Sequence, residues 1–196
     1  MEIRVFTIGS YRTNCYMAWA EGSNSCILVD PGYEPEYLLE QVRLLRKEIA
    51  AILLTHGHFD HIGGVKAIAE ETGCRVYIHE DDLCLNPRLT GGPVYHTNTY
   101  GEGDQLQLAG LTLQVLHTPG HTPGCVCLLC EDVMFAGDTL FAGTCGRTDL
   151  PHSAPEKMRT SLNRLAALEG NYQVLPGHGR ASTLDEERKL NPFMPR

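Results

Sequence analysis

The six residues from His56 to His61 hold three histidines and one aspartate, a density that metal binding explains better than any other role. Imidazole nitrogens and carboxylate oxygens are the ligands of zinc and of non-haem iron and manganese. Apolar residues lead into this run at 51–54 and follow it at Ile62 and Val65. The pattern therefore predicts a loop between a buried strand and a helix, and such loops often carry functional side chains. An expression tag would not be internal and bracketed by core-type sequence. A solvated loop would not explain the further His and Asp residues downstream.

Three further candidate ligands each follow an apolar, strand-like segment. They are His121, Asp138 and His178, and a glycine lies next to each of them. Glycine lets the backbone pack closely around a cation because it has no side chain. A single placement of this kind would be unremarkable. Three of them, added to the 56–61 run, predict that these side chains meet at one edge of the fold.

Short segments rich in β-forming residues alternate with segments of helical periodicity along the chain. We expect strands at 3–8, 15–20, 26–29, 51–54, 75–78, 105–108, 111–116, 125–129, 133–135 and 173–175, and helices at 35–47, 64–71, 80–85, 155–168 and from 183 onward. This order predicts one α/β domain over residues 1–196, with two packed sheets and helices outside. Segment 86–104, rich in Gly and Pro, is long for a connection, so we expect a loop over the site or a simple connector.

Charge and hydropathy narrow the class of partner. The formal net charge of −8 argues against nucleic acid, because phosphate contacts need a basic face. No apolar run has the length needed to cross a bilayer, so no membrane partner is expected. Residues 1–10 alternate like a strand and lack the features of a secretion signal. We therefore expect a cytoplasmic protein that acts on a small-molecule substrate.

The motifs, in this order, resemble those of the metallo-β-lactamase superfamily, and within it the compact glyoxalase II-like (hydroxyacylglutathione hydrolase-like) branch. The resemblance covers most of the chain, from Asp30 to His178. It implies an αββα metallo-β-lactamase-type sandwich, with two mixed sheets, helices outside and a metal centre at one edge. By position it implies a first metal held by His56, His58 and His121, a second metal held by Asp60, His61 and His178, and Asp138 as the bridge between them.

The resemblance also implies what the site holds around those ligands. The expected cofactor is zinc, as one or two ions, with iron or manganese as alternatives. Asp30 would lie outside the ligand set and orient one of the ligands through a hydrogen bond. A turn at Asp30-Pro31-Gly32 is an equally ordinary reason for an aspartate at that position.

The reaction that the resemblance favours is hydrolysis of a thioester, such as an S-acylglutathione, by a metal-bound hydroxide. Asp60 and Asp138 would be the catalytic carboxylates. Larger glyoxalase II enzymes carry a C-terminal helical domain that contacts glutathione. Only 18 residues follow His178 here, so we expect no separate C-terminal substrate domain. A smaller thioester or a different thiol therefore stays open.

Other reactions fit the same pattern of ligands. An iron-dependent persulfide dioxygenase of this superfamily would use His56, His121 and Asp138 around a single iron. Such dioxygenases and compact glyoxalase II-like proteins both have a stretch similar to Gly146-Arg147-Thr148-Asp149. Hydrolysis of a β-lactam or lactone, and a non-catalytic metal-binding protein, are lesser alternatives.

Two residues are candidates for binding the substrate. Arg147 could hold a substrate carboxylate through two hydrogen bonds, or could form a structural pair with Asp149. Tyr100, in the 86–104 segment, is the second candidate.

Overall fold

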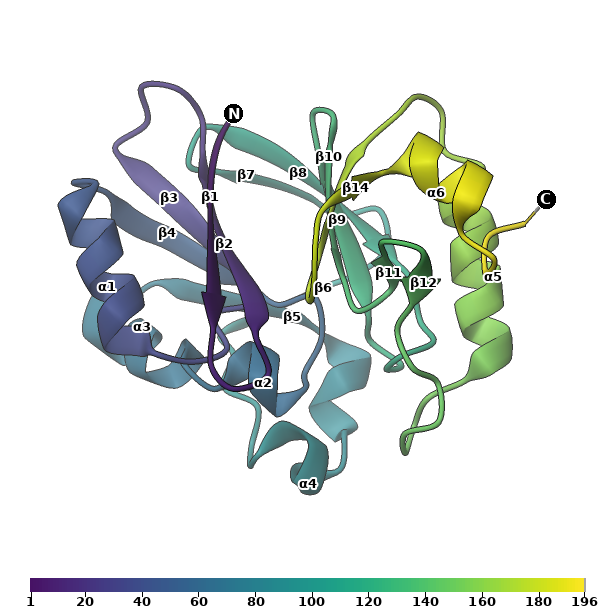
Figure 1. Ribbon diagram of the computed structural model, residues 1–196. Coiled ribbons are helices and arrows are strands. Elements are labelled where there is room, and N and C mark those ends of the chain that lie inside the picture. The colour runs from purple at the N-terminus through teal and green to yellow at the C-terminus, as the bar shows by residue number, and fades with distance from the viewer. Residues whose placement is uncertain (196) are drawn as a thin grey trace.

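The computed structural model describes residues 1–195, in which two six-stranded sheets lie face to face and helices cover their outer sides (Figure 1). In order across the first sheet, the strands are β1 (Glu2–Ile8), β2 (Thr13–Trp19), β3 (Ser25–Val29), β4 (Glu48–Leu53), β5 (Arg75–His79) and β6 (Asn98–Tyr100). Strands β1 to β3 pair antiparallel, and β3 to β6 pair parallel. The first sheet is therefore mixed.

The second sheet is also mixed. In order across it, the strands are β14 (Ser182–Thr183), β13 (Gln173–Pro176), β10 (Val133–Gly137), β9 (Val126–Cys130), β8 (Leu111–His117) and β7 (Gln105–Leu108). Only β10 and β13 pair parallel, and the other neighbours are antiparallel. A short hairpin of β11 (Leu140–Phe141) and β12 (Thr144–Cys145) lies beside this sheet.

Helices form the two outer layers because each presents an apolar stripe to a sheet. On the first sheet lie α1 (Pro35–Leu44) and α3 (Val65–Thr72); on the second lie α5 (Pro155–Ala166) and α6 (Leu184–Leu190) (Figure 1). The other helices within residues 1–195 are short: α2 (Phe59–Ile62), the 3₁₀ helix η1 (Glu80–Cys84) and α4 (Pro87–Thr90). The αββα architecture expected from the motifs is confirmed.

The apolar interior is divided between the two faces of the second sheet. Along β9, Val126 and Leu128 belong to the core between the sheets, whereas Cys127 and Leu129 belong to the cluster under α5. Successive side chains of a strand point to opposite faces, so a strand covered on both faces is apolar throughout. This explains why β9 shows no polar alternation in the sequence.

The candidate ligands follow strands that run in the same direction. In the second sheet β8, β10 and β13 are all parallel to one another, because β9 is antiparallel to both β8 and β10. Their carboxyl ends therefore reach one edge of the sheet, and the loops after them carry His121, Asp138 and His178. The loop after β4 of the first sheet carries the 56–61 run to the same edge.

Two backbone hydrogen bonds join the sheets at this edge. Val126 donates its N–H to the Thr55 carbonyl at 2.9 Å, and Asn14 donates its N–H to the Gly177 carbonyl at 2.8 Å. Buried backbone groups need such partners. These bonds fix the loops that carry the candidate ligands relative to each other.

The 86–104 segment differs from expectation, since it contains α4 and the edge strand β6 rather than only a loop. Strand β6 has three residues with polar side chains, too short for a period-2 pattern, and its pairing with β5 forms it. Within residues 1–195, no helix combines the length and the apolar character needed to cross a membrane.

Removing the Phe135 ring should strongly destabilise the fold. Phe135 is fully buried in β10 and its ring lies 5.5 Å from the ring of Tyr16 in β2, so it joins the two sheets. We expect Phe135→Ala to lower the free energy of unfolding by about 3–5 kcal/mol. Leu44→Ala, at an exposed position of α1, should change it by less than about 0.5 kcal/mol. Urea unfolding measures both, and equal effects would contradict the assigned core.

Candidate metal centre

The structure brings all seven predicted metal ligands to one edge of the sandwich. They line or lie beneath a cavity of about 520 Å³. The side chains form two clusters. The first is His56, His58 and His121, and the second is Asp60, His61 and His178.

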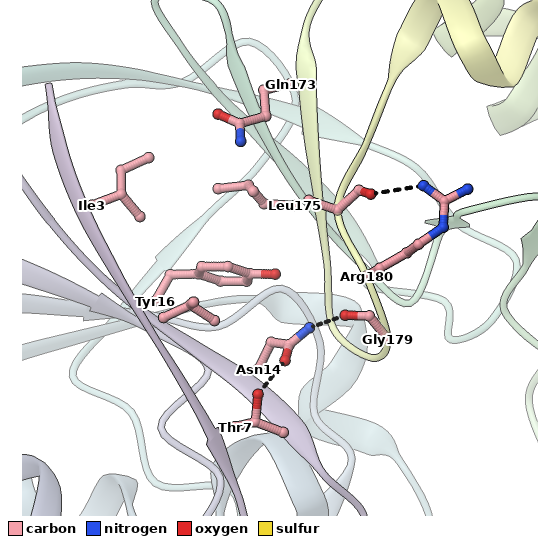
Figure 2. Close-up of a pocket in the computed structure, with 10 residues that line it drawn as sticks. Ile3, Thr7, Asn14, Tyr16, Gln173, Leu175, Gly179 and Arg180 are labelled. Carbon is pink, nitrogen blue, oxygen red and sulfur yellow. Dashed lines mark hydrogen bonds between the residues drawn. The ribbon is translucent and has the colours of Figure 1, made fainter.

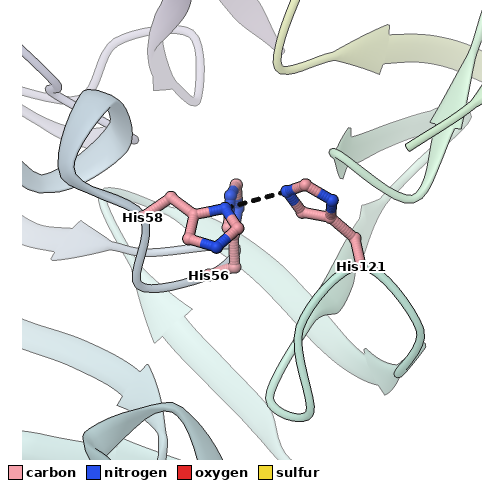
Figure 3. Close-up of side chains that lie close together, drawn as sticks. All are labelled: His56, His58 and His121. Atoms are coloured by element: carbon pink, nitrogen blue, oxygen red, sulfur yellow. Dashed lines mark hydrogen bonds between the residues drawn. The ribbon is translucent and has the colours of Figure 1, made fainter. Parts of the chain in front are cut away.

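The first cluster joins the two sheets. His56 and His58 come from the loop after β4, and His121 comes from the loop after β8 (Figure 3). All three rings are buried, and His58 Nδ1 lies 2.9 Å from His121 Nε2. Two imidazole nitrogens on one tetrahedral zinc are about 3.3 Å apart, given Zn–N bonds of about 2.0–2.1 Å. The arrangement is close to that of a bound metal ion.

The second cluster lies next to the first. His178 Nε2 lies 3.2 Å from both His61 Nε2 and Asp60 Oδ2. The rings of His56 and His61 have centroids 4.1 Å apart. Two cations could therefore lie side by side at this edge.

Asp138 lies between the clusters. Its Oδ2 is 3.4 Å from His121 Nε2 and 3.7 Å from His178 Nε2, and its Oδ1 is 3.5 Å from His61 Nε2. A side chain at Gly177 would remove this space, since its Cβ would lie 2.3 Å from Asp138 Oδ1. The glycine beside His178 therefore permits the close approach that its sequence position predicted.

Unpaired polar atoms show that the site suits a cation. His56 Nε2, His58 Nε2 and Asp138 Oδ1 are buried and have no hydrogen-bond partner within the described residues 1–195. A buried polar atom without a partner is costly. An imidazole nitrogen such as His56 Nε2 and a carboxylate oxygen such as Asp138 Oδ1 are donors that zinc, iron and manganese accept. The residues present thus fit a metal centre.

The histidines of the two clusters differ in protonation. Burial, followed by the neighbouring imidazoles, lowers the pKa of His58 to about 4 and holds the pKa of His56 well below its usual value. Burial opposes protonation of His61 as well, but Asp138 and Asp30 outweigh it and raise its pKa to about 9. Without a metal ion, His61 therefore carries a proton at neutral pH, whereas His56 and His58 are neutral.

Asp30 lies outside both clusters and contacts one of their members. Its Oδ2 is 2.9 Å from His61 Nδ1, which turns His61 Nε2 toward Asp60 and Asp138. Asp30 also accepts hydrogen bonds from Thr55 N and Thr55 Oγ1 at 2.7 and 2.6 Å. A carboxylate in this position fixes the orientation of a histidine ligand.

Several contacts of the ligands were not predicted from the sequence. The Arg147 carbonyl lies 2.8 Å from His121 Nδ1, and Thr13 Oγ1 donates to Asp60 Oδ2 at 3.4 Å. The buried carboxylate of Asp82 accepts a hydrogen bond from Gly57 N between two ligands. Asp82 follows β5, so the strand-end rule that found the other acids could have found it.

The loop that carries His178 is also held by hydrogen bonds on the side away from the two clusters. A second cavity, of about 410 Å³, lies between β1 and β2 of one sheet and β13 of the other (Figure 2). On its wall, Asn14 Nδ2 donates to the Gly179 carbonyl at 2.9 Å, and Thr7 Oγ1 donates to Asn14 Oδ1 (Figure 2). Asn14 Nδ2 also donates to the Pro176 carbonyl at 3.1 Å. These bonds hold both sides of His178.

The two candidate substrate residues lie in different places. Arg147 lines the cavity, and its exposed guanidinium donates to both carboxylate oxygens of Asp149 at 2.8 and 2.9 Å. Tyr100 is 4 % exposed and donates its hydroxyl to the Leu54 carbonyl. Tyr100 is not among the residues that line the cavity, so the expectation that it binds substrate is corrected: it packs in the core because β6 pairs with β5.

The cavity over the clusters has a largely apolar wall. The apolar side chains that line it are Tyr11, Phe59, Leu89, Phe141 and Leu150. Tyr11 and Phe59 contact each other edge to face, with centroids 5.1 Å apart. Leu89 of α4 is the part of the 86–104 segment that borders the site. The arrangement can hold an uncharged group next to the candidate ligands.

Comparison of the sequence with protein families gives a match to the metallo-β-lactamase superfamily over residues 8–178. An uncharacterised protein of Mycobacterium leprae is 35% identical, with 99% of each chain covered. The hydroxyacylglutathione hydrolase GloC of Haemophilus influenzae is 31% identical, with 99% of this chain and 98% of the relative covered.

Solved structures show the same fold. The crystal structure of the BLEG-1 B3 metallo-β-lactamase has a TM-score of 0.89 at 33% identity, covering 98% of this chain and 99% of its own. TTHA1623 in a di-iron-bound form has a TM-score of 0.85 at 37% identity, covering 97% and 100%. ETHE1 from Myxococcus xanthus has a TM-score of 0.86 at 29% identity, covering 98% and 84%.

The family match spans most of the chain, and the neighbours share its two mixed sheets and outer helices. The resemblance expected from the motifs is confirmed, and this chain belongs to the metallo-β-lactamase superfamily.

Proposed function

We propose that this protein is a metal-dependent thioesterase that hydrolyses an S-acylglutathione or a similar small thioester. The observation that carries the proposal is a complete set of donors for two ions, joined by Asp138 and opening into one cavity. The relative from Haemophilus influenzae, described as a hydroxyacylglutathione hydrolase, supports this reaction.

In this proposal each cluster would hold one ion, and the Asp138 carboxylate would contribute to both sites. His56, His58 and His121 would hold the first ion, and Asp60, His61 and His178 the second. The ions, when bound, would lower the pKa of a water toward about 7 and polarise the thioester carbonyl. Zinc suits these donors, and so do iron and manganese.

The carboxylates of the chain have separate proposed roles. Asp138 keeps the two sites a fixed distance apart. Burial disfavours the ionised form of Asp60. The hydrogen bond from His178 and the charge of His61 outweigh burial and hold the pKa of Asp60 well below its usual range. Asp60 is therefore ionised and can accept a hydrogen bond from the attacking water, which directs a lone pair toward the carbonyl.

The cavity is proposed to hold the rest of the substrate. Its apolar wall suits the acyl group or the carbon chain of the thiol. Arg147 is the only arginine or lysine among the described residues that line it, and it already pairs with Asp149. A substrate carboxylate would share this arginine with Asp149, so strong recognition of a highly anionic thiol is not expected from this wall.

A second candidate is an iron-dependent persulfide dioxygenase. The neighbours ETHE1 and the di-iron form of TTHA1623 favour it. In this case His56, His121 and Asp138 would hold one iron. The second cluster would then be surplus, which is why hydrolysis is preferred.

The reaction can be tested with protein purified without added metal. We expect elemental analysis to find metal and the protein to release free thiol from an S-acylglutathione, without oxygen consumption. Oxygen uptake with glutathione persulfide, together with an iron content near one per chain, would replace hydrolysis with oxidation. Turnover of nitrocefin in place of both would indicate a lactamase, the class to which the BLEG-1 neighbour belongs.

Truncation of Asp138 should weaken metal binding. We expect Asp138→Ala to lose at least one metal ion and to lower kcat/KM by more than about 100-fold, since loss of an outer contact alone costs 10–100-fold. Asp132→Ala, at an exposed position in the turn between β9 and β10, is the matched control and should keep metal and activity. Normal metal content in Asp138→Ala, measured by elemental analysis, would show that Asp138 is not a ligand.

Metal binding should release a proton. In the metal-free protein the pKa of His61 is about 9, so a bound ion must displace its proton. We expect affinity to rise with pH, by up to about tenfold per unit, until about pH 9. The His61 contribution to stability of the metal-free protein has the opposite trend. It is complete below the unfolded pKa of about 6.5 and is lost as pH rises through 9.

Calorimetric titration with zinc in buffers of different ionisation heat measures the released proton. Urea unfolding of the metal-free protein across the same pH range measures the stability. Binding without proton release at about pH 7.5 would contradict the assigned state of His61.

A further inference from the structure

Asp82 is a buried carboxylate for which the ligand set gives no role. It lies in η1 after β5 and is 0 % exposed. It accepts hydrogen bonds from Gly57 N at 2.8 Å, from Thr122 Oγ1 at 2.8 Å and from Gly124 N at 2.6 Å. Both carboxylate oxygens are used, Oδ2 by the first two donors and Oδ1 by the third.

The three donors belong to the two loops that carry the first cluster. Gly57 separates His56 from His58, and Thr122 follows His121. One loop comes from the first sheet and the other from the second. A single carboxylate therefore ties together backbone segments that lie far apart in the sequence and that must hold His58 and His121 side by side.

The absence of a side chain at Gly124 allows this contact with Asp82. A Cβ at Gly124 would lie 2.7 Å from both Cγ and Oδ1 of Asp82, so only glycine allows its N–H to approach. Hydrogen bonds to an ionised acceptor are stronger than those between neutral groups. A buried carboxylate is costly unless all its partners are present. The two loops are thus held in one relative position.

We propose that Asp82 is a positioning residue that sets the spacing of His58 and His121, and so the metal affinity of the first cluster. This inference rests on the proposed use of that cluster as a metal site. It assigns Asp82 no contact with the metal or the substrate.

Asp82→Asn tests the proposal with almost no change of shape. One terminal atom of asparagine is an NH₂ group, which would face an N–H donor and lose at least one of the three hydrogen bonds. We expect the Zn²⁺ affinity of the first cluster to fall by about 10–100-fold. Competition with a chromophoric chelator measures this affinity. The measurement is made in a His178→Ala background, in which the second cluster is weakened and the first cluster binds Zn²⁺ more tightly than the second.

Asp81→Asn is the matched control. Asp81 is the neighbouring acid of the same 3₁₀ helix, and its side chain is 51% exposed. The same change of charge and chemistry is therefore made one residue away, without touching either loop. We expect the Zn²⁺ affinity of the first cluster to be unchanged in this variant.

Thr122 supplies a second pair of variants that leaves Asp82 itself in place. Thr122→Val keeps the shape of the side chain but removes the hydroxyl that donates to Asp82, whereas Thr122→Ser keeps the hydroxyl. We expect the valine variant to weaken Zn²⁺ binding and to shift the visible absorption spectrum of the Co²⁺-loaded protein. The serine variant should restore most of both. A purely structural role of Thr122 would not give this pattern.

The outcomes distinguish the proposed role of Asp82 from the proposed reaction. Unchanged Zn²⁺ affinity and Co²⁺ spectrum in Asp82→Asn and Thr122→Val would overturn the role of Asp82. If circular dichroism shows that Asp82→Asn does not fold, the Thr122 pair decides. Weakened Zn²⁺ binding in a protein that hydrolyses no thioester would support Asp82 while rejecting the proposed reaction. Thioester hydrolysis with unchanged affinity in the variants would reject Asp82 alone.

Discussion

The carboxylate of Asp138 lies between two groups of imidazoles, and the whole edge of the sandwich is arranged around that contact. Its two oxygens lie 3.4 to 3.7 Å from ring nitrogens of His121, His61 and His178. These rings come from different loops and from both sheets. Close packing of so many polar groups is unfavourable without a cation, since several of their atoms have no other partner among the described residues.

The fold supplies what holds such an arrangement together. Two apolar clusters, one between the sheets and one under α5, fix the strands, and the ligand loops are short extensions of those strands. Three strands of the second sheet point the same way, so their ends bring ligands to one place. Hydrogen bonds between the sheets, at Thr55 and at Asn14, then limit the movement of the loops. A site built this way is positioned before any ion binds.

The same donors suit hydrolysis and oxidation, so the identity of the metal separates the proposed reactions more than the fold does. Neighbours of this chain include a B3 metallo-β-lactamase, a protein in a di-iron-bound form and ETHE1. All share the sandwich, which illustrates that function depends on the site and not on the fold alone. The apolar wall of the cavity and Arg147 beside it are the features of this chain that bear on substrate choice.

The sequence by itself determined the architecture and indicated the candidate ligands. Metal-binding residue types at the ends of strands are a local property of the sequence. So is the spacing of apolar residues, which alternate in strands and recur every three to four residues in helices. They predicted His121, Asp138 and His178 together with the 56–61 run, and the two sheets with outer helices. They could not place Tyr100, because its burial depends on the pairing of β6 with β5.

Only the tertiary structure decided which distant groups meet. Asp82 lies 25 residues from Gly57 and 40 from Thr122 in the sequence, and Thr13 lies 47 residues from Asp60. The Arg147 carbonyl contacts His121, although the sequence drew attention to the guanidinium. Such contacts follow from how two sheets pack face to face, and a single sequence carries no local pattern for the register between them.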